Sequence, residues 1–257
     1  MIDARPRIDK QERKAAVKQR MLMMALGAIL ALGMALPVAL AQESPAPSQD
    51  LGELGAEWWQ WAFRKPVDTN PLVGSYEGGA QCAGGGAGNV WFLAGVTFLP
   101  GSSIEPVERT CHVPANKWIF FPVVNAECST VEGNPPPGGS LEECATIFLE
   151  DTLANSTDLV ATVDGEDVLG DISDNRAASG LFTFTLPKNN ADFFCPDGTG
   201  GFQQCPPGPT EAATHGIWVL LPPLERGTHT IHFGGTFFGT ITLDITYNLT
   251  VKGKPTS

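Results

Sequence analysis

Three titratable residues lie in segments where catalysis could be assembled. Glu57 precedes an aromatic run, Glu127 lies close to the end of an apolar segment, and His215 stands at the start of another. Two carboxyl groups that face each other across roughly 5–10 Å can hydrolyse a glycosidic bond, and a histidine can carry a proton beside them. The chain holds 28 acidic residues, so such a pair can also arise by accident. These three residues are our candidates for a secreted carboxylate-dependent hydrolase or lyase that acts on a polysaccharide or another polymer.

Tryptophan suggests a second kind of function, which is ligand binding. The chain has six tryptophans, and in a small domain most of them fill the core, whereas exposed rings can stack on sugar faces. Trp59 lies off the apolar stripe of an expected helix, and Trp218 alternates away from an apolar strand face. We expect these two rings to be exposed and to contact a glycan-like ligand. A binding or envelope-associated module is our first hypothesis, and the hydrolase is the alternative.

An acidic run begins at Asp164. Its residues Asp164, Glu166 and Asp167 could hold a structural calcium ion, because calcium prefers several oxygen ligands from one loop. Its spacing is not that of an EF-hand, so the alternative is a hairpin turn followed by an exposed acidic loop. No zinc-protease, serine-hydrolase or phosphate-loop motif occurs in the sequence. We therefore expect no cofactor other than this possible calcium.

The cysteines indicate how the domain is stabilised. All six lie after residue 81, and an even count in an exported chain is typical of a disulfide framework. No C-x-x-C spacing occurs, which argues against a zinc ribbon or a redox site. Six cysteines can pair in many ways, and we expect the sequential arrangement, which is Cys82–Cys111, Cys128–Cys144 and Cys195–Cys205.

Two helices and about eight strands would position these residues. Helical spacing of apolar residues predicts a helix over 49–64 with Ser48 as its N-cap, and Ser140 with Glu143 forms a capping box for a second helix. Expected strands are 90–99, 118–124, 158–163, 166–169, 181–186, 217–221, 228–233 and 241–251. In the last of these, apolar and polar residues alternate throughout, as in a half-buried antiparallel strand. The fold class is therefore all-β, a β-sandwich of jelly-roll or Ig-like type.

The beginning of the chain has the three parts of a secretory signal peptide. A basic segment precedes the apolar run Met21–Leu36, and the A-x-A sequence at 39–41 is a cleavage site. An N-terminal membrane anchor is the alternative, but the run is shorter than the roughly 20 residues of a spanning helix. We expect a signal peptide at 1–41, a Pro/Ser linker at 42–49 and one domain at 50–254. The mature chain would then lack a transmembrane segment and be periplasmic or extracellular.

Charge excludes one class of partner. The formal net charge is −12 and the pI is about 4.7, whereas phosphate binding needs a surplus of lysine and arginine. We expect no nucleic-acid partner, and a glycan or an envelope component instead.

Several motifs together resemble a family of exported bacterial proteins of unknown function. They are WWxW from Trp58, NP at 70–71, GxVWFLAG from Gly88, RTCxVP from Arg109, FFPxxN from Phe120 and GxHxIxFGG from Gly227. The resemblance covers most of the expected mature chain. It implies bacterial export and supports the Cys82–Cys111 pairing, and it implies no activity, cofactor or catalytic residue.

Overall fold

A computed structural model describes residues 50–72, 82, 86, 88–97, 105–190, 195–199 and 201–253. The expected signal peptide and linker lie outside the described residues, as do the last two residues of the expected strand at 90–99, so these predictions stay predictions. Within the described part of the chain, no helix has the length and apolar character needed to cross a membrane.

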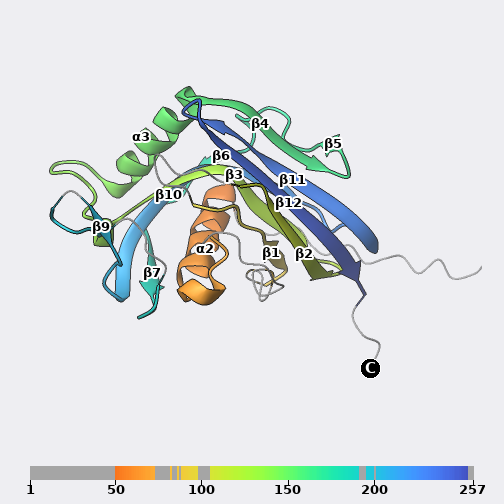
Figure 1. The fold of residues 1–257 in the computed structure, drawn as a ribbon, viewed down its shortest axis with the longest axis horizontal. Helices are drawn as coiled ribbons and strands as arrows, with labels where there is room; N and C mark the ends of the chain where they lie inside the picture. The colour runs from red at the N-terminus through yellow and green to blue at the C-terminus, as the bar shows by residue number, and fades with distance from the viewer. Residues whose placement is uncertain are drawn as a thin grey trace, which may run out of the picture. The chain divides into compact units, whose positions relative to one another are not determined.

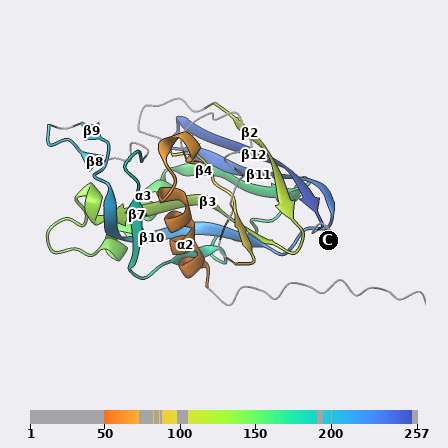
Figure 2. The same cartoon turned by 90° about the horizontal axis from the view of Figure 1, so that it is seen from below.

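Two five-stranded sheets, which we call sheet A and sheet B, pack against each other (Figures 1 and 2). Sheet A contains β1 (Val90–Phe92), β3 (Trp118–Ser129), β10 (Gly208–Leu221) and β6 (Arg176–Ala178) in that order, and β7 (Phe182–Leu186) pairs with another part of β10. Sheet B has the order β2 (Val107–Pro114), β12 (Ile241–Lys252), β11 (Gly227–Phe237), β4 (Ser156–Val163) and β5 (Glu166–Asp167). A two-stranded ribbon joins β8 (Cys195–Pro196) to β9 (Phe202–Gln203). The predicted sandwich-like fold of two packed sheets is confirmed.

Both sheets are mixed rather than purely antiparallel. The last strand, β12, pairs antiparallel with β11 as its alternating sequence predicted, but it pairs parallel with β2 on its other side. Likewise, β3 is antiparallel to β10 and parallel to the short β1. The sequence patterns predict no strand for the β2 segment, which in the structure alternates between buried and exposed residues.

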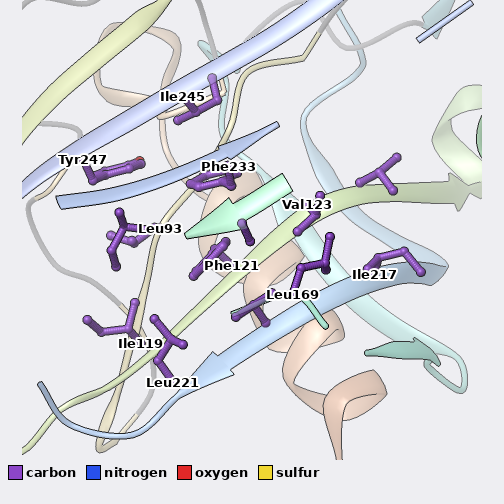
Figure 3. Packing of buried hydrophobic residues seen from close by; sticks show 14 of the residues in the cluster. Leu93, Ile119, Phe121, Val123, Leu169, Ile217, Leu221, Phe233, Ile245 and Tyr247 are labelled. Carbon is purple, nitrogen blue, oxygen red and sulfur yellow. The ribbon is translucent and has the colours of Figure 1, made fainter. Parts of the chain in front are cut away.

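The main core lies between the two sheets (Figure 3). Alternate residues of β10, among them Ile217 and Leu221, point into this layer, as do Ile119 and Phe121 of β3. Phe121 meets Phe233 of sheet B with ring centroids 4.6 Å apart. The other face of β10 belongs to a second core, because side chains alternate between the faces of a strand.

The helix α2 (Leu51–Phe63) covers that second face of sheet A (Figure 1). It begins two residues later than predicted, because Asp50 and not Ser48 is the N-cap and accepts a hydrogen bond from the backbone N–H of Glu53. Gly52 and Gly55 bring it close to the sheet. A Cβ on Gly52 would collide with the carbonyl of Ala178 in β6, and one on Gly55 would lie 2.7 Å from the Trp218 ring. These glycines weaken the helix in isolation, yet they permit its docking.

The second helix, α3 (Leu141–Ala154), begins as predicted, with the Ser140 side chain accepting from the backbone N–H of Glu143. It packs on β3 and β10. Three disulfides join Cys82 to Cys111, Cys128 to Cys144 and Cys195 to Cys205, the sequential arrangement expected from the chain order. The second bond fastens α3 to β3.

Candidate functional site

A cavity of about 200 Å³ lies between α2, the middle of β3 and sheet B. Its aromatic lining comes from Trp58, Trp59 and Phe63 of α2 and from Phe233 of β11. Its polar lining is concentrated on β3 and the short helix η3 (Thr130–Glu132) that follows. The strand β1 pairs with β3 only as far as Phe120, so the stretch of β3 along the cavity has no described strand beside it on that edge.

An irregularity in β3 decides which polar side chains reach the cavity. On β10, Ile217 pairs with Val124 and the next residue, Trp218, pairs with Pro122, so one extra residue is inserted in β3. Such a bulge shifts the alternation of the side chains that follow it. Asn125 and Glu127 consequently lie on the α2 face of sheet A, although an unbroken strand would place them on the same face as Phe121.

The pairing partner of Glu127 confirms this orientation. Thr214 lies directly opposite Glu127 on β10, and its hydroxyl accepts a hydrogen bond of 2.8 Å from the indole N–H of Trp59 on α2. Opposite residues of a strand pair point to the same face. The Thr214 hydroxyl in turn donates to the Ala126 carbonyl at 2.6 Å. The wall of the cavity between α2 and β3 is therefore held by a chain of hydrogen bonds.

Glu127 and Glu132 form a carboxyl pair at the cavity. Burial is the main cause that raises the pKa of Glu127 well above its usual range, and the neighbouring Glu132 raises it further. Burial also raises the pKa of Glu132 to about 7, although contacts with Ser129, Glu127 and Asn134 oppose this shift. Two adjacent carboxylates in a poorly solvated place cannot both ionise at low cost. The pair therefore holds a proton to a higher pH than two isolated carboxyl groups would.

Two buried polar atoms of the cavity lining have no hydrogen-bond partner among the described residues. They are Nδ2 of Asn125, a donor, and Oε1 of Glu127. More than nine in ten buried polar groups in folded proteins are hydrogen-bonded, and leaving one unpaired costs about 1–3 kcal/mol. These atoms mark the place where the polar group of a ligand, or water, would complete the hydrogen bonding.

Of the three catalytic candidates, only Glu127 lies at the cavity. Glu57 is on α2 but outside the lining, and its pKa is raised by burial and by Glu53. His215 points to the opposite face of sheet A, because it neighbours Thr214 in the strand. There it accepts from Arg176 Nε at 3.1 Å and contacts Thr146 Oγ1 of α3 at 3.1 Å. The expected partnership of His215 with Glu127 is therefore wrong.

The expected exposure of the two tryptophans is also wrong. Trp59 is 6 % exposed and Trp218 is 0 % exposed, because α2 covers the face of sheet A that the prediction had left to solvent. Trp218 stacks on Phe120 with an interplanar angle of 14° and donates to the carbonyl of Ala177. It does not line the cavity, whereas Trp59 does. Trp59 is thus the one of the pair that a ligand in the cavity would meet.

The acidic run forms the hairpin that was the alternative to a calcium site. β4 and β5 pair across the turn at Asp164, whose carboxylate contacts His229 Nδ1 at 2.7 Å and accepts from the Thr230 N–H at 2.8 Å. Asp167 accepts from two backbone N–H groups, and Glu166 is exposed. In the described ranges, no three acidic, histidine or cysteine side chains gather as a metal site would require.

Sequence reasoning missed Asn125, Glu132 and the buried Arg109, which braces the cavity wall. Arg109 donates to the Ala94 carbonyl and the Tyr247 hydroxyl, both at 2.6 Å, and to the Pro71 carbonyl at 2.7 Å. These bonds fix Ala94 and Pro71, which directly precede the lining residues Gly95 and Leu72. The place of Arg109 in the RTCxVP motif was the only signal that could have drawn attention to it.

Comparison with known proteins adds no assignment, since no protein-family model, no curated protein and no solved structure matches the chain. The resemblance to exported bacterial proteins stays a prediction.

Proposed function

We propose that this chain is an exported binding protein that holds a small, mainly apolar ligand in the cavity beside Glu127. One observation carries the proposal: Asn125 and Glu127, which each have a buried polar atom without a partner, line a cavity with aromatic walls. Pockets for small molecules are typically apolar with a few convergent polar groups. The three disulfides are typical of proteins that function in an oxidising compartment, which supports export.

The size of the cavity limits the ligand. A cavity of roughly 150 Å³ holds a benzene molecule, so about 200 Å³ admits one ring with a short substituent. A glycan chain would enter only by a terminal sugar, and the two tryptophans expected to stack on it are buried. We therefore propose a small molecule, or the end of an envelope component, in place of a polymer surface.

A variant that fills the cavity tests this proposal. Gly95 lines the cavity, and a Cβ there would meet only the Phe233 ring at 3.9 Å, so Gly95→Leu should occupy the space without a backbone clash. The matched control is Gly180→Leu, because Gly180 has open space around it. In a fragment screen followed by ligand-detected NMR, hits should bind the wild type and Gly180→Leu but not Gly95→Leu. Hits that bind all three proteins equally would refute the cavity as the site.

The carboxyl pair favours one alternative function. Adjacent carboxyls that share a proton can act as acid and base toward a water molecule, as in aspartic proteases, whereas glycosidases set their two carboxyls apart across the substrate. We propose as second candidate an acid-type hydrolase that uses Glu127 and Glu132. A screen with peptide, ester and glycoside substrates should then show turnover that Glu127→Gln and Glu132→Gln abolish. His215→Ala, on the opposite face of sheet A, is the control that keeps its activity.

A further inference from the structure

The cavity carries acidic and aromatic groups without a basic side chain to balance them. Its described lining includes Glu127, Glu132 and four aromatic rings, but no lysine, arginine or histidine. Among the described residues, the buried basic side chain is Arg109, which is outside the lining and donates to the carbonyls of Ala94, Gly95 and Pro71 and to the Tyr247 hydroxyl. An anionic ligand would therefore meet a carboxyl pair with no cation facing it, and this is a costly arrangement.

A cation fits the same surroundings. The π faces of tryptophan and phenylalanine attract an ammonium group, and the attraction grows when both partners are removed from water. An ammonium also brings three N–H donors, one of which could satisfy the unpaired Oε1 of Glu127. An oxygen next to the amine could accept from Nδ2 of Asn125, the other unpaired atom. The net charge of −12 draws cations toward the protein as a whole.

We infer that the ligand of this cavity is a small organic cation, a protonated amine on a single ring or an equally small apolar body, bound through its N–H groups to Glu127. This inference rests on the proposed binding function and adds the chemical class of the ligand. Glu127 is the positioning group for the amine, and the aromatic residues from α2 and β11 enclose the apolar body.

Binding should release a proton. Glu127 and Glu132 are the titratable groups of the described lining, and together they hold a proton to a higher pH than isolated carboxyl groups do. A nearby positive charge favours the ionised form of a carboxyl group. The amine should therefore displace part of the proton that the pair holds, while a neutral ligand should leave it in place.

Two probes of nearly equal shape test the inference, 2-phenylethylamine and 2-phenylethanol, titrated calorimetrically into the full exported chain at pH 7. A hydrogen bond to a charged group contributes about 1.5–3 kcal/mol, so the amine should bind roughly ten- to a hundredfold more tightly than the alcohol. Glu127→Gln should remove this preference, so that the two probes bind the variant with equal affinity. Glu211→Gln, an exposed position of β10, should behave as the wild type.

The outcomes separate this inference from the proposed function. Equal affinity for the two probes, or a preference for the amine that survives in Glu127→Gln, overturns the cationic ligand and leaves the cavity as a binding site. If neither probe binds while fragments still bind in a manner blocked by Gly95→Leu, only the cationic class is overturned. If Glu127→Gln does not fold, the wild type decides: proton release, measured in two buffers of different ionisation enthalpy, must accompany the amine and not the alcohol.

Discussion

The carboxyl pair at the cavity should make the protein less stable as the pH rises from mildly acidic to neutral. In the unfolded chain each glutamic acid has a pKa near 4.5. In the folded chain the pKa of Glu132 is raised to about 7, and the pKa of Glu127 is raised as well. Between these values the folded protein binds more protons than the unfolded chain, so its stability falls with increasing pH. The stability that proton binding by the pair contributes is fully present below the pKa of the unfolded chain. It is lost as the pH rises through the pKa of the folded chain.

The magnitude follows from Glu132. A shift from 4.5 to about 7 corresponds to about 3 kcal/mol, since one pKa unit is about 1.4 kcal/mol. For a domain of this size, that loss lowers the melting temperature by roughly 6–12 °C. Because the two carboxyls titrate as one system, a single substitution shifts the titration and only the double variant Glu127→Gln/Glu132→Gln removes it.

The assay is thermal unfolding at several pH values between 5 and 8. The melting temperature of the wild type should fall across this range relative to that of the double variant, by the amount given above. Other groups titrate here as well, including His215, whose pKa is lowered by burial and by Arg176. They are common to both proteins and cancel in the comparison. Parallel pH curves for the two proteins would refute the reasoning that the half-buried pair holds a proton to a higher pH than isolated carboxyl groups do.

Three further predictions concern the packing around the site, each measured by denaturant unfolding. Gly52→Ala should destabilise by at least about 2 kcal/mol, because its Cβ meets the backbone of β6, whereas Gly180→Ala should be near neutral; equal effects would show that α2 does not dock so closely. Thr214→Val should cost about 1–3 kcal/mol by leaving the indole N–H of Trp59 unpaired, and no loss would mean that this bond is not formed. Ser140→Ala should cost about 1 kcal/mol as a lost N-cap, and a neutral result would argue against the cap.

Local rules predicted the parts of the fold that depend on local chemistry. The capping box placed the start of α3 at Ser140, because an N-cap acts within one helical turn. Alternation along 241–251 placed β12, since one face is buried throughout. The same alternation does not show which strand pairs with the other edge of β12, and for this reason the parallel neighbour β2 was not predicted.

Burial of the tryptophans depended on a contact between distant elements. The pattern around Trp218 correctly assigned this ring to the face opposite Ile217, but whether that face meets solvent or a helix is decided by the docking of α2. The residues that permit this docking are Gly52 and Gly55, which approach β6 and Trp218. From the sequence alone, a glycine inside a helix indicates only a loss of helix stability. A small residue reveals its role only when its neighbour across the interface is known.

The site itself depends on a single inserted residue. If the side chains alternated without interruption from Phe121, Glu127 would lie in the apolar layer between the sheets, where burial of a carboxyl group is costly. The bulge opposite Ile217 and Trp218 moves the side chains that follow it to the other face of the strand. Asn125 and Glu127 therefore both lie in the otherwise mainly apolar lining of the cavity. Bulges are common next to functional sites, where they re-aim a side chain. A register shift that leaves two residues of the cavity lining with buried, unpartnered polar atoms has a cost in hydrogen bonding, and a bound ligand or water that reached these atoms would offset it.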